Sequence, residues 1–139
     1  MELSRSDAMP SFHDGSFDGL YLPGDKRARL FLTTLNKEQF TIVLDGVEAL
    51  RLCDVKEGNI VNGVLFIDTN ELTEGHISFA HDLSDIARDK EHIAACLASA
   101  QKAGLRGLAI KSSYGLEGVV LFKRIEFSKG PHENARGAA

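Results

Sequence analysis

Apolar and polar residues alternate along most of the first half of the chain. In residues 27–34 the side chains of Ala28 and Leu30 fall on one face, and this two-residue period is that of a β-strand. Turn-forming residues bracket the segment, since Pro23 and a glycine precede it and Asn36 follows it. The same alternation predicts strands over residues 38–45 and 47–53, and residues 16–22 are also predicted as a strand. Residues 60–68 are predicted as an internal strand, because their centre at residues 64–67 is apolar on both faces.

The residue composition changes after position 82, where strand-forming residues are replaced by alanine, lysine and leucine. Ile93 and Ala100 repeat at helical spacing, Asp89 is a typical N-cap residue, and Gly104 is typical of the position just past a helix end. These features predict one substantial helix over residues 89–103. The remaining segments predicted as strands are 76–80, 106–112 and 117–127.

The order of these elements predicts a mainly β fold of the α+β class. About seven or eight strands accompany a single helix, which comes too late in the chain to be the crossover of a wound parallel sheet. We expect an antiparallel β-sandwich or a bent open barrel, with the helix covering one end. We expect residues 12–127 to form a single globular domain, between a flexible arm at residues 1–11 and a flexible tail at residues 128–139.

The charge of the chain weighs against one class of partner. Its 139 residues carry a formal net charge of -4, and the basic residues are scattered. Nucleic-acid binding usually begins with clustered Lys and Arg, so it is not expected here. No apolar run reaches the roughly 18 residues of a membrane span, and the N-terminal residues lack the apolar core of an export signal. We expect a cytoplasmic protein without a membrane partner.

The cysteines and histidines predict neither a metal nor any other cofactor. Cys53 and Cys96 are interpreted as reduced, small core hydrophobes, without a Cys or His at ligand spacing and without a cationic neighbour. His76 and His81 are separated by an odd number of positions, which puts them on opposite faces of a strand. Zinc sites instead require ligands that converge on one face.

Two short motifs are candidates for a ligand site. His13 and Asp14 pair an imidazole with a carboxylate, which is a combination used in acid–base chemistry. Ser112, Ser113 and Tyr114 place hydroxyls at the end of a predicted strand. A small-molecule site or a hydrolase that used both motifs would need them to line one pocket. Ordinary turn chemistry is the alternative explanation of each motif.

Four short motifs follow one another along the chain, and they are Phe12-His13-Asp14-Gly15, Asp45-Gly46-Val47, Gly58-Asn59-Ile60 and Lys111-Ser112-Ser113-Tyr114-Gly115. Together they resemble a group of small bacterial β-sandwich proteins, some of which are immunity-protein-like and block a toxin partner. The resemblance extends in element order over residues 12–127, and it implies a fold and a bacterial setting but no catalytic residues.

The sequence therefore favours a non-catalytic binding or protein-interaction domain over an enzyme. An immunity-like protein would present acidic loops to a basic partner, because binding residues concentrate on loops held by a rigid sheet. A homodimer formed through a sheet face or edge is a further expectation. The acidic residues expected to contact a partner are Asp54, Glu57, Glu71, Glu74 and Asp82.

Overall fold

The fold is built on one antiparallel sheet. The computed structural model describes residues 10–56, 58–83, 86–112 and 116–132, with residues 86–89 described by their backbone alone. Within these residues the strand order is β4-β7-β6-β5-β1-β2-β3-β8. The strands are β1 (Gly15–Gly24), β2 (Arg27–Thr33), β3 (Gln39–Asp45), β4 (Ala49–Cys53), β5 (Ile60–Ile67), β6 (Arg106–Ser112), β7 (Glu117–Phe122) and β8 (Arg124–Lys129).

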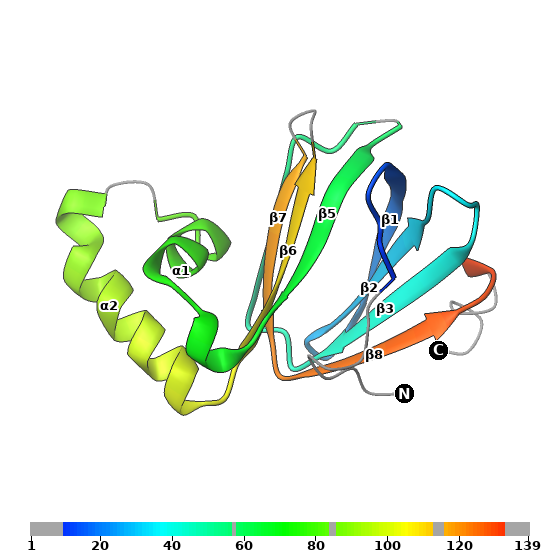
Figure 1. The fold of residues 1–139 in the computed structure, drawn as a ribbon. Helices are drawn as coiled ribbons and strands as arrows, with labels where there is room; N and C mark the ends of the chain where they lie inside the picture. The colour runs from blue at the N-terminus through cyan, green and yellow to red at the C-terminus, as the bar shows by residue number, and fades with distance from the viewer. Residues whose placement is uncertain (1–9, 57, 84–85, 113–115, 133–139) are drawn as a thin grey trace.

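The sheet is bent so that its two halves face each other, β4-β7-β6-β5 on one side and β1-β2-β3-β8 on the other (Figure 1). The halves meet at a short seam, where Gly15 of β1 pairs with Val61 of β5 and Ser16 pairs with Ile60. On the other side Lys123 alone separates β7 from β8, so one continuous segment passes from the first half to the second. The sheet is thus strongly bent but not closed into a barrel.

The main core fills the space between the two halves. Burying one Leu, Ile or Phe side chain contributes about 1.5–3 kcal/mol, so this layer dominates the stability of the domain. Its buried residues are Phe12, Phe17, Ala28, Leu30, Leu32, Phe40, Ile42, Leu44, Val61, Leu108, Ile110, Leu116, Val120, Phe122 and Ile125.

A β-bulge in β1 reconciles the sequence of that strand with the core. Phe17 pairs with Leu32 and Gly19 pairs with Phe31, so Asp18 is the extra residue between them. Phe17 packs in the core and Leu20 against it, although their separation is odd. A bulge inserts one residue and so restores the inward face after a shift in the alternation. It leaves Asp18 on the outer side of the sheet.

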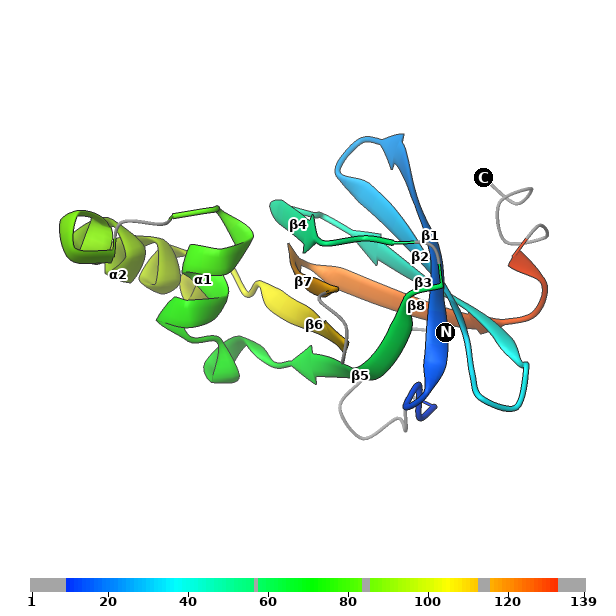
Figure 2. The ribbon, with the colours of Figure 1, turned by 90° about the horizontal axis from the view of Figure 1, so that it is seen from above.

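Two helices cover the outer face of the β4-β7-β6-β5 half (Figure 2). A 3-10 turn, η1 (Thr69–Glu71), leads into α1 (Glu74–Ala80), and α2 (Ile86–Lys102) packs against α1. Neither α1 nor α2, nor any other described helix, has the length and hydropathy that a membrane crossing requires. A second core joins these helices to the sheet, and its buried residues are Ile67, Leu72, Ile77, Ala80, Ile93, Ala100, Leu105, Ala109, Val119 and Leu121.

The predicted fold class is confirmed, and the positions of several elements are corrected. The strand expected over residues 76–80 is wrong, because this segment belongs to α1. Thr73 caps that helix: its hydroxyl accepts a hydrogen bond from the His76 amide, while the Thr73 amide donates to the His76 ring. Ile77 and Ala80 are then buried on one face of the helix, at i and i+3.

The other corrections concern where elements begin and end. The long helix is confirmed, but α2 begins at Ile86 and ends at Lys102. The single strand expected over residues 117–127 is two strands, because the amide of Lys123 donates to the carbonyl of Asp45 and the chain changes neighbours from β6 to β3. The expected tail from position 128 starts too early, since β8 continues to Lys129.

Candidate functional site

The first predicted ligand motif forms the turn that leads into β1. His13 Nδ1 lies 3.1 Å from the carbonyl oxygen of Asn62, and His13 Nε2 lies 3.5 Å from Asp14 Oδ2. The Asp14 amide donates to the carbonyl of Val61, and Asp14 adopts a left-handed φ of 62°. Both side chains are exposed. Their contacts go to β5 and to each other, which is the turn chemistry that the sequence offered as an alternative.

The second predicted motif lies across β5 from the first. Ser112 and Gly15 are both Cα partners of Val61, one from each side of β5. Two strand spacings, about 10 Å, therefore separate the backbone of Ser112 from that of the first motif. Ser113 and Tyr114 lie outside the described residues. A shared pocket for the two motifs stays a prediction.

The acidic residues predicted to meet a partner are engaged in different ways. Asp82 Oδ1 lies 3.2 Å from Arg51 Nη2, and Glu71 Oε1 accepts a hydrogen bond of 3.2 Å from the Asp68 amide. Glu74 lies in the first turn of α1, whereas Asp82 follows the residue that caps the other end of that helix. Exposed Asp54 follows the end of β4 and has a left-handed φ of 58°, and Glu57 lies outside the described residues.

A hollow of about 180 Å³ lies between α1 and the outer face of β5, β6 and β7. We call it the α1 hollow. Its apolar lining comes from Leu65 on β5, Ala109 on β6, Val119 on β7 and Phe79 on α1. These positions face outward because neighbours such as Leu108 and Val120 face the main core. An apolar cavity of about 150 Å³ binds benzene, so the α1 hollow has room for the apolar body of a small ligand.

Polar side chains from α1 and from the β6–β7 hairpin line the same hollow, and they are His76, Lys111 and Glu117. Lys111 and Glu117 are Cα partners across the hairpin, and both are exposed. Among the ion pairs between described residues, none joins these two side chains. The hollow therefore presents one cation and one anion that do not neutralise each other by contact.

The third polar side chain of the hollow is held as neutral imidazole. Burial lowers the pKa of His76 below its ordinary value of 6.5, and the positive charge of Lys111 lowers it further. His76 Nδ1 accepts a hydrogen bond of 3.0 Å from the Thr73 amide, which requires an unprotonated Nδ1 and leaves the ring hydrogen on Nε2. A perturbed titratable group in a hollow is a physical indicator of a functional site.

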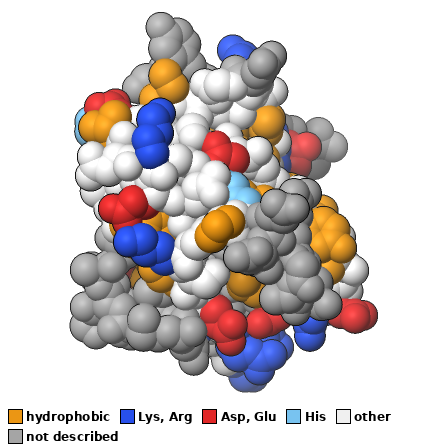
Figure 3. All heavy atoms as spheres, turned by 90° about the vertical axis from the view of Figure 1, so that its right-hand side faces the viewer, with side chains coloured by type: hydrophobic (Ala, Val, Ile, Leu, Met, Phe, Trp, Pro, Cys, Tyr) orange, Lys and Arg blue, Asp and Glu red, His pale blue; other side chains and the backbone are white. Residues whose placement is uncertain are grey.

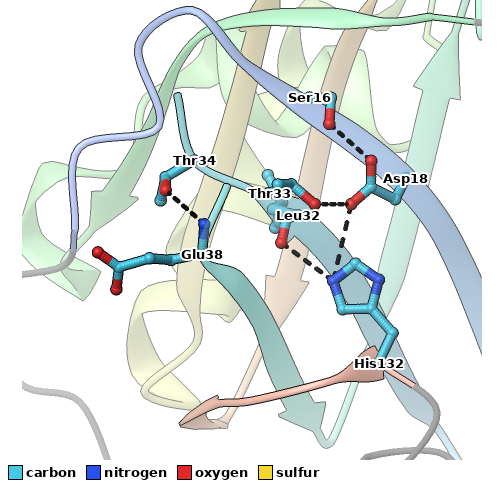
Figure 4. A network of polar contacts seen from close by, with 7 residues as sticks. All are labelled: Ser16, Asp18, Leu32, Thr33, Thr34, Glu38 and His132. Carbon is cyan, nitrogen blue, oxygen red and sulfur yellow. Dashed lines mark hydrogen bonds and ion pairs between the residues drawn. The ribbon is translucent and has the colours of Figure 1, made fainter. Parts of the chain in front are cut away.

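A different polar cluster lies on the far half of the sheet, centred on Asp18 (Figure 4). Asp18 Oδ1 accepts a hydrogen bond of 2.6 Å from the Ser16 hydroxyl, and Oδ2 accepts one from the Thr33 hydroxyl. His132 Nε2 lies 3.0 Å from the Leu32 carbonyl oxygen and 3.7 Å from Asp18 Oδ2. The His132 ring also packs on Phe31, with 5.2 Å between ring centroids.

The Asp18 cluster lacks the order of a catalytic triad. In such a triad a histidine stands between the hydroxyl and the carboxylate and takes the proton of the nucleophile. Here the hydroxyls of Ser16 and Thr33 donate to the carboxylate themselves, and the described contacts of His132 Nε2 go to a backbone carbonyl and the same carboxylate. The cluster fixes His132, and with it the end of the described chain, to the outer face of β1 and β2.

The outer face of the β1-β2-β3-β8 half carries acidic and basic side chains interspersed with one another (Figure 3). One ion pair of this mixture joins Arg27 and Asp45, which are Cα partners on β2 and β3, with 3.3 Å between Arg27 Nε and Asp45 Oδ1. A mixed face of this kind does not attract a partner through charge of one sign.

Sequence reasoning missed the three polar residues of the α1 hollow as a group. Lys111 and Glu117 flank the hydroxyl motif that the sequence singled out, so the motif pointed to the right hairpin. The sequence interpretation of His76 concerns a metal site alone, with the spacing to His81 tested on a strand and on a helix. The signal that could have found it is Thr73, which stands three residues before His76 as in a capping box.

Comparison with known proteins leaves the resemblance untested. No family model, no curated protein and no solved structure matches the chain.

Proposed function

We propose that this chain is a non-catalytic binding domain whose ligand occupies the α1 hollow. The ligand is a small molecule with a compact apolar body, a carboxylate and an ammonium group, which is the chemistry of an apolar amino acid. The observation that carries the proposal is the pair Lys111 and Glu117, which face each other across a hairpin without an ion pair and line an apolar hollow.

Each part of the hollow has a counterpart in such a ligand. The side chain of Lys111 supplies a cation for the carboxylate, and that of Glu117 supplies an anion for the ammonium group. The apolar body replaces water over Leu65 and Val119, a contact that contributes about 25 cal/mol per Å² of apolar surface buried. His76 adds a neutral polar group, so it does not compete with Lys111 as a second cation.

The test is a titration of isotope-labelled protein followed by NMR, with three molecules that share one apolar body. Leucine carries both charged groups, 4-methylpentanoate lacks the ammonium group, and 3-methylbutylamine lacks the carboxylate. We expect leucine to shift the amide signals of residues 76, 109–111 and 117–119, and the two analogues to bind several-fold more weakly. Equal affinities, or shifts confined to other residues, would contradict the proposal.

Two substitutions assign the charges. Lys111→Gln is expected to weaken leucine and 4-methylpentanoate but not 3-methylbutylamine, and Glu117→Gln is expected to weaken leucine and the amine only. Lys102→Gln, at an exposed lysine in the last turn of α2, is the matched control and should change none of the affinities. If Lys102→Gln lowered the affinity as much as Lys111→Gln, the affinity would depend on the net charge of the protein and not on the position of Lys111.

A protein partner is the second candidate, and exposed apolar side chains favour it. Val55, Ile60 and Leu65 are 55%, 45% and 58% exposed, on β5 and in the loop before it. Exposed apolar side chains of this size can contribute to an interaction surface, and a second copy of the chain is the simplest partner. Sedimentation over a range of concentrations should then show dimers that Leu65→Glu abolishes, whereas a monomer at every concentration would contradict this candidate.

A further inference from the structure

A second hollow, of about 270 Å³, lies between α2 and the end of β7. We call it the α2 hollow. Cys96, Ser99 and Ala100 line it from α2, Leu121 lines it from β7, and Lys123 lies at its margin just past that strand. Cys96 is a free thiol and is half-buried, so its sulfur is sheltered but reachable from the hollow.

An imidazole stands beside this thiol. His92 precedes Cys96 by one helical turn, and Cys96 Sγ lies 3.6 Å from His92 Nε2 and 4.0 Å from Nδ1. The interpretation that Cys96 has no histidine at useful spacing is therefore wrong. A base within hydrogen-bond reach of a sulfur can take its proton as the sulfur attacks, which is the arrangement of an activated nucleophile.

The other cysteine of the chain has different surroundings at a similar depth. Cys53 is also free and half-buried, but it ends β4 and its Cα partner on β7 is Glu117, a carboxylate. Among the described contacts, no imidazole lies within hydrogen-bond reach of Cys53 Sγ, whereas His92 lies beside Cys96 Sγ. The chain thus contains its own matched comparison between an assisted and an unassisted thiol.

We propose that Cys96 is a modification site that reacts with low-molecular-weight disulfides bearing carboxylates. Cys96 Sγ attacks one sulfur of the disulfide, so a new S–S bond forms while the original S–S bond breaks. The thiol proton passes to His92, and the departing thiolate takes a proton from water. The disulfide is the oxidant, and one of its halves leaves as a free thiol while the other stays on Cys96.

The preference for carboxylates follows from Lys123. Its side chain lies against Gly46, since a Cβ added at Gly46 would come within 2.8 Å of Lys123 Cβ, and it lines the α2 hollow with Cys96. Glu48 also lines the hollow, but its carboxylate lies 3.3 Å from Lys26 Nζ and is therefore partly neutralised. The cation of Lys123 then favours an anionic disulfide over a cationic one.

The experiment uses two single-thiol proteins, Cys53→Ser and Cys96→Ser, each treated with oxidised glutathione or with the cationic disulfide cystamine. Intact-mass spectrometry follows formation of the mixed disulfide. We expect the thiol of Cys96 to react with oxidised glutathione about tenfold faster than that of Cys53. The same rates measured in urea provide the baseline, where the difference should disappear because the fold that pairs His92 with Cys96 is lost.

Two further variants, both in the Cys53→Ser protein, separate the roles. His92→Gln should slow the reaction of Cys96 with both disulfides. Lys123→Gln should slow the reaction with oxidised glutathione but not with cystamine. Equal rates at the two cysteines in the folded protein, or a rate at Cys96 that His92→Gln leaves unchanged, would overturn the proposal.

Discussion

The α1 hollow and the Asp18 cluster are both built from charged and polar side chains on the outer side of the sheet, yet they differ in how those side chains are partnered. In the Asp18 cluster each carboxylate oxygen accepts a hydrogen bond from a hydroxyl, and His132 closes the group. In the α1 hollow Lys111 and Glu117 face each other without an ion pair. A cluster that satisfies itself holds the chain together, whereas an unsatisfied pair is available to a ligand.

The difference has an energetic side that experiments can measure. Hydrogen bonds to a charged group contribute about 1.5–3 kcal/mol, and removing one partner leaves the others unsatisfied. Exposed charges away from such groups contribute within about ±0.5 kcal/mol. Substitutions in the Asp18 cluster should therefore lower the free energy of unfolding more than substitutions in the α1 hollow.

The largest effect is expected for Asp18→Ala. It removes the acceptor of the hydroxyls of Ser16 and Thr33, and we expect the free energy of unfolding to fall by about 2 kcal/mol in urea denaturation. Glu126→Ala, at an exposed residue of β8 on the same half, is the control and should stay within about 0.5 kcal/mol of the wild type. Similar losses in the two variants would mean that the cluster has no special role.

A smaller effect is expected for His132→Ala. This change removes the contact with the Leu32 carbonyl and the packing on Phe31, and we expect a loss of about 1 kcal/mol. Because His132 also faces Asp18, the double variant with Asp18→Ala should lose less than the sum of the two single losses. Strict additivity in a double-mutant cycle would show that the two side chains are not coupled.

The pH dependence of stability tests the neutral state of His76. Its pKa is lowered in the folded protein, so below its ordinary value of 6.5 the unfolded chain binds a proton that the folded chain does not. Stability from this group is complete above pH 6.5 and is lost as the pH falls toward the lowered folded value. Denaturation curves from pH 8 to pH 5 measure this loss.

His76→Gln is the matched variant for that measurement. Glutamine at this position of a capping box also accepts a hydrogen bond from the N-cap amide, here that of Thr73, so the helix cap is retained while the titration is removed. At pH 8 we expect the variant to match the wild type within about 0.5 kcal/mol. Its loss of stability toward pH 5 should be smaller, and an identical pH profile would refute the assignment.

The smallest effect on stability is expected for Lys111→Gln and Glu117→Gln. Both residues are exposed and share no ion pair, so each variant should stay within about 0.5 kcal/mol of the wild type in urea denaturation. Their affinities for leucine should change nonetheless. A variant that lost both stability and affinity for leucine would show that its side chain stabilises the fold, as the side chains of the Asp18 cluster do.

The sequence predicted the strands well where one face is apolar and the other polar. Residues 27–34 and 38–45 became β2 and β3 because alternation follows directly from burying one face of a sheet. Residues 76–80 are too short for a period to distinguish a helix from a strand, and the decisive feature was the cap formed by Thr73. Histidine in place of the usual Glu or Gln made that cap hard to recognise.

The candidate sites also differ in how far the sequence could predict them. The contact between His92 and Cys96 was within reach of the sequence, because the predicted helix over residues 89–103 already placed the two residues one turn apart. The α1 hollow was not, because it requires α1 to lie over β6 and β7, and no local pattern specifies how a helix docks on a sheet. The hydroxyl of Ser112 indicated the β6–β7 hairpin, but it did not indicate that Lys111 and Glu117 line a hollow there.

The position of β8 at the end of the strand order has a consequence for how the protein is made. The chain leaves the ribosome from its N-terminus, so β1, β2 and β3 can pair as a meander early, while β3 lacks its outer neighbour. That neighbour, β8, comes last among the described strands, and it is joined through Lys123 to β7 of the other half. Until β8 has been synthesised, the exposed edge of β3 is the surface that a chaperone would need to protect.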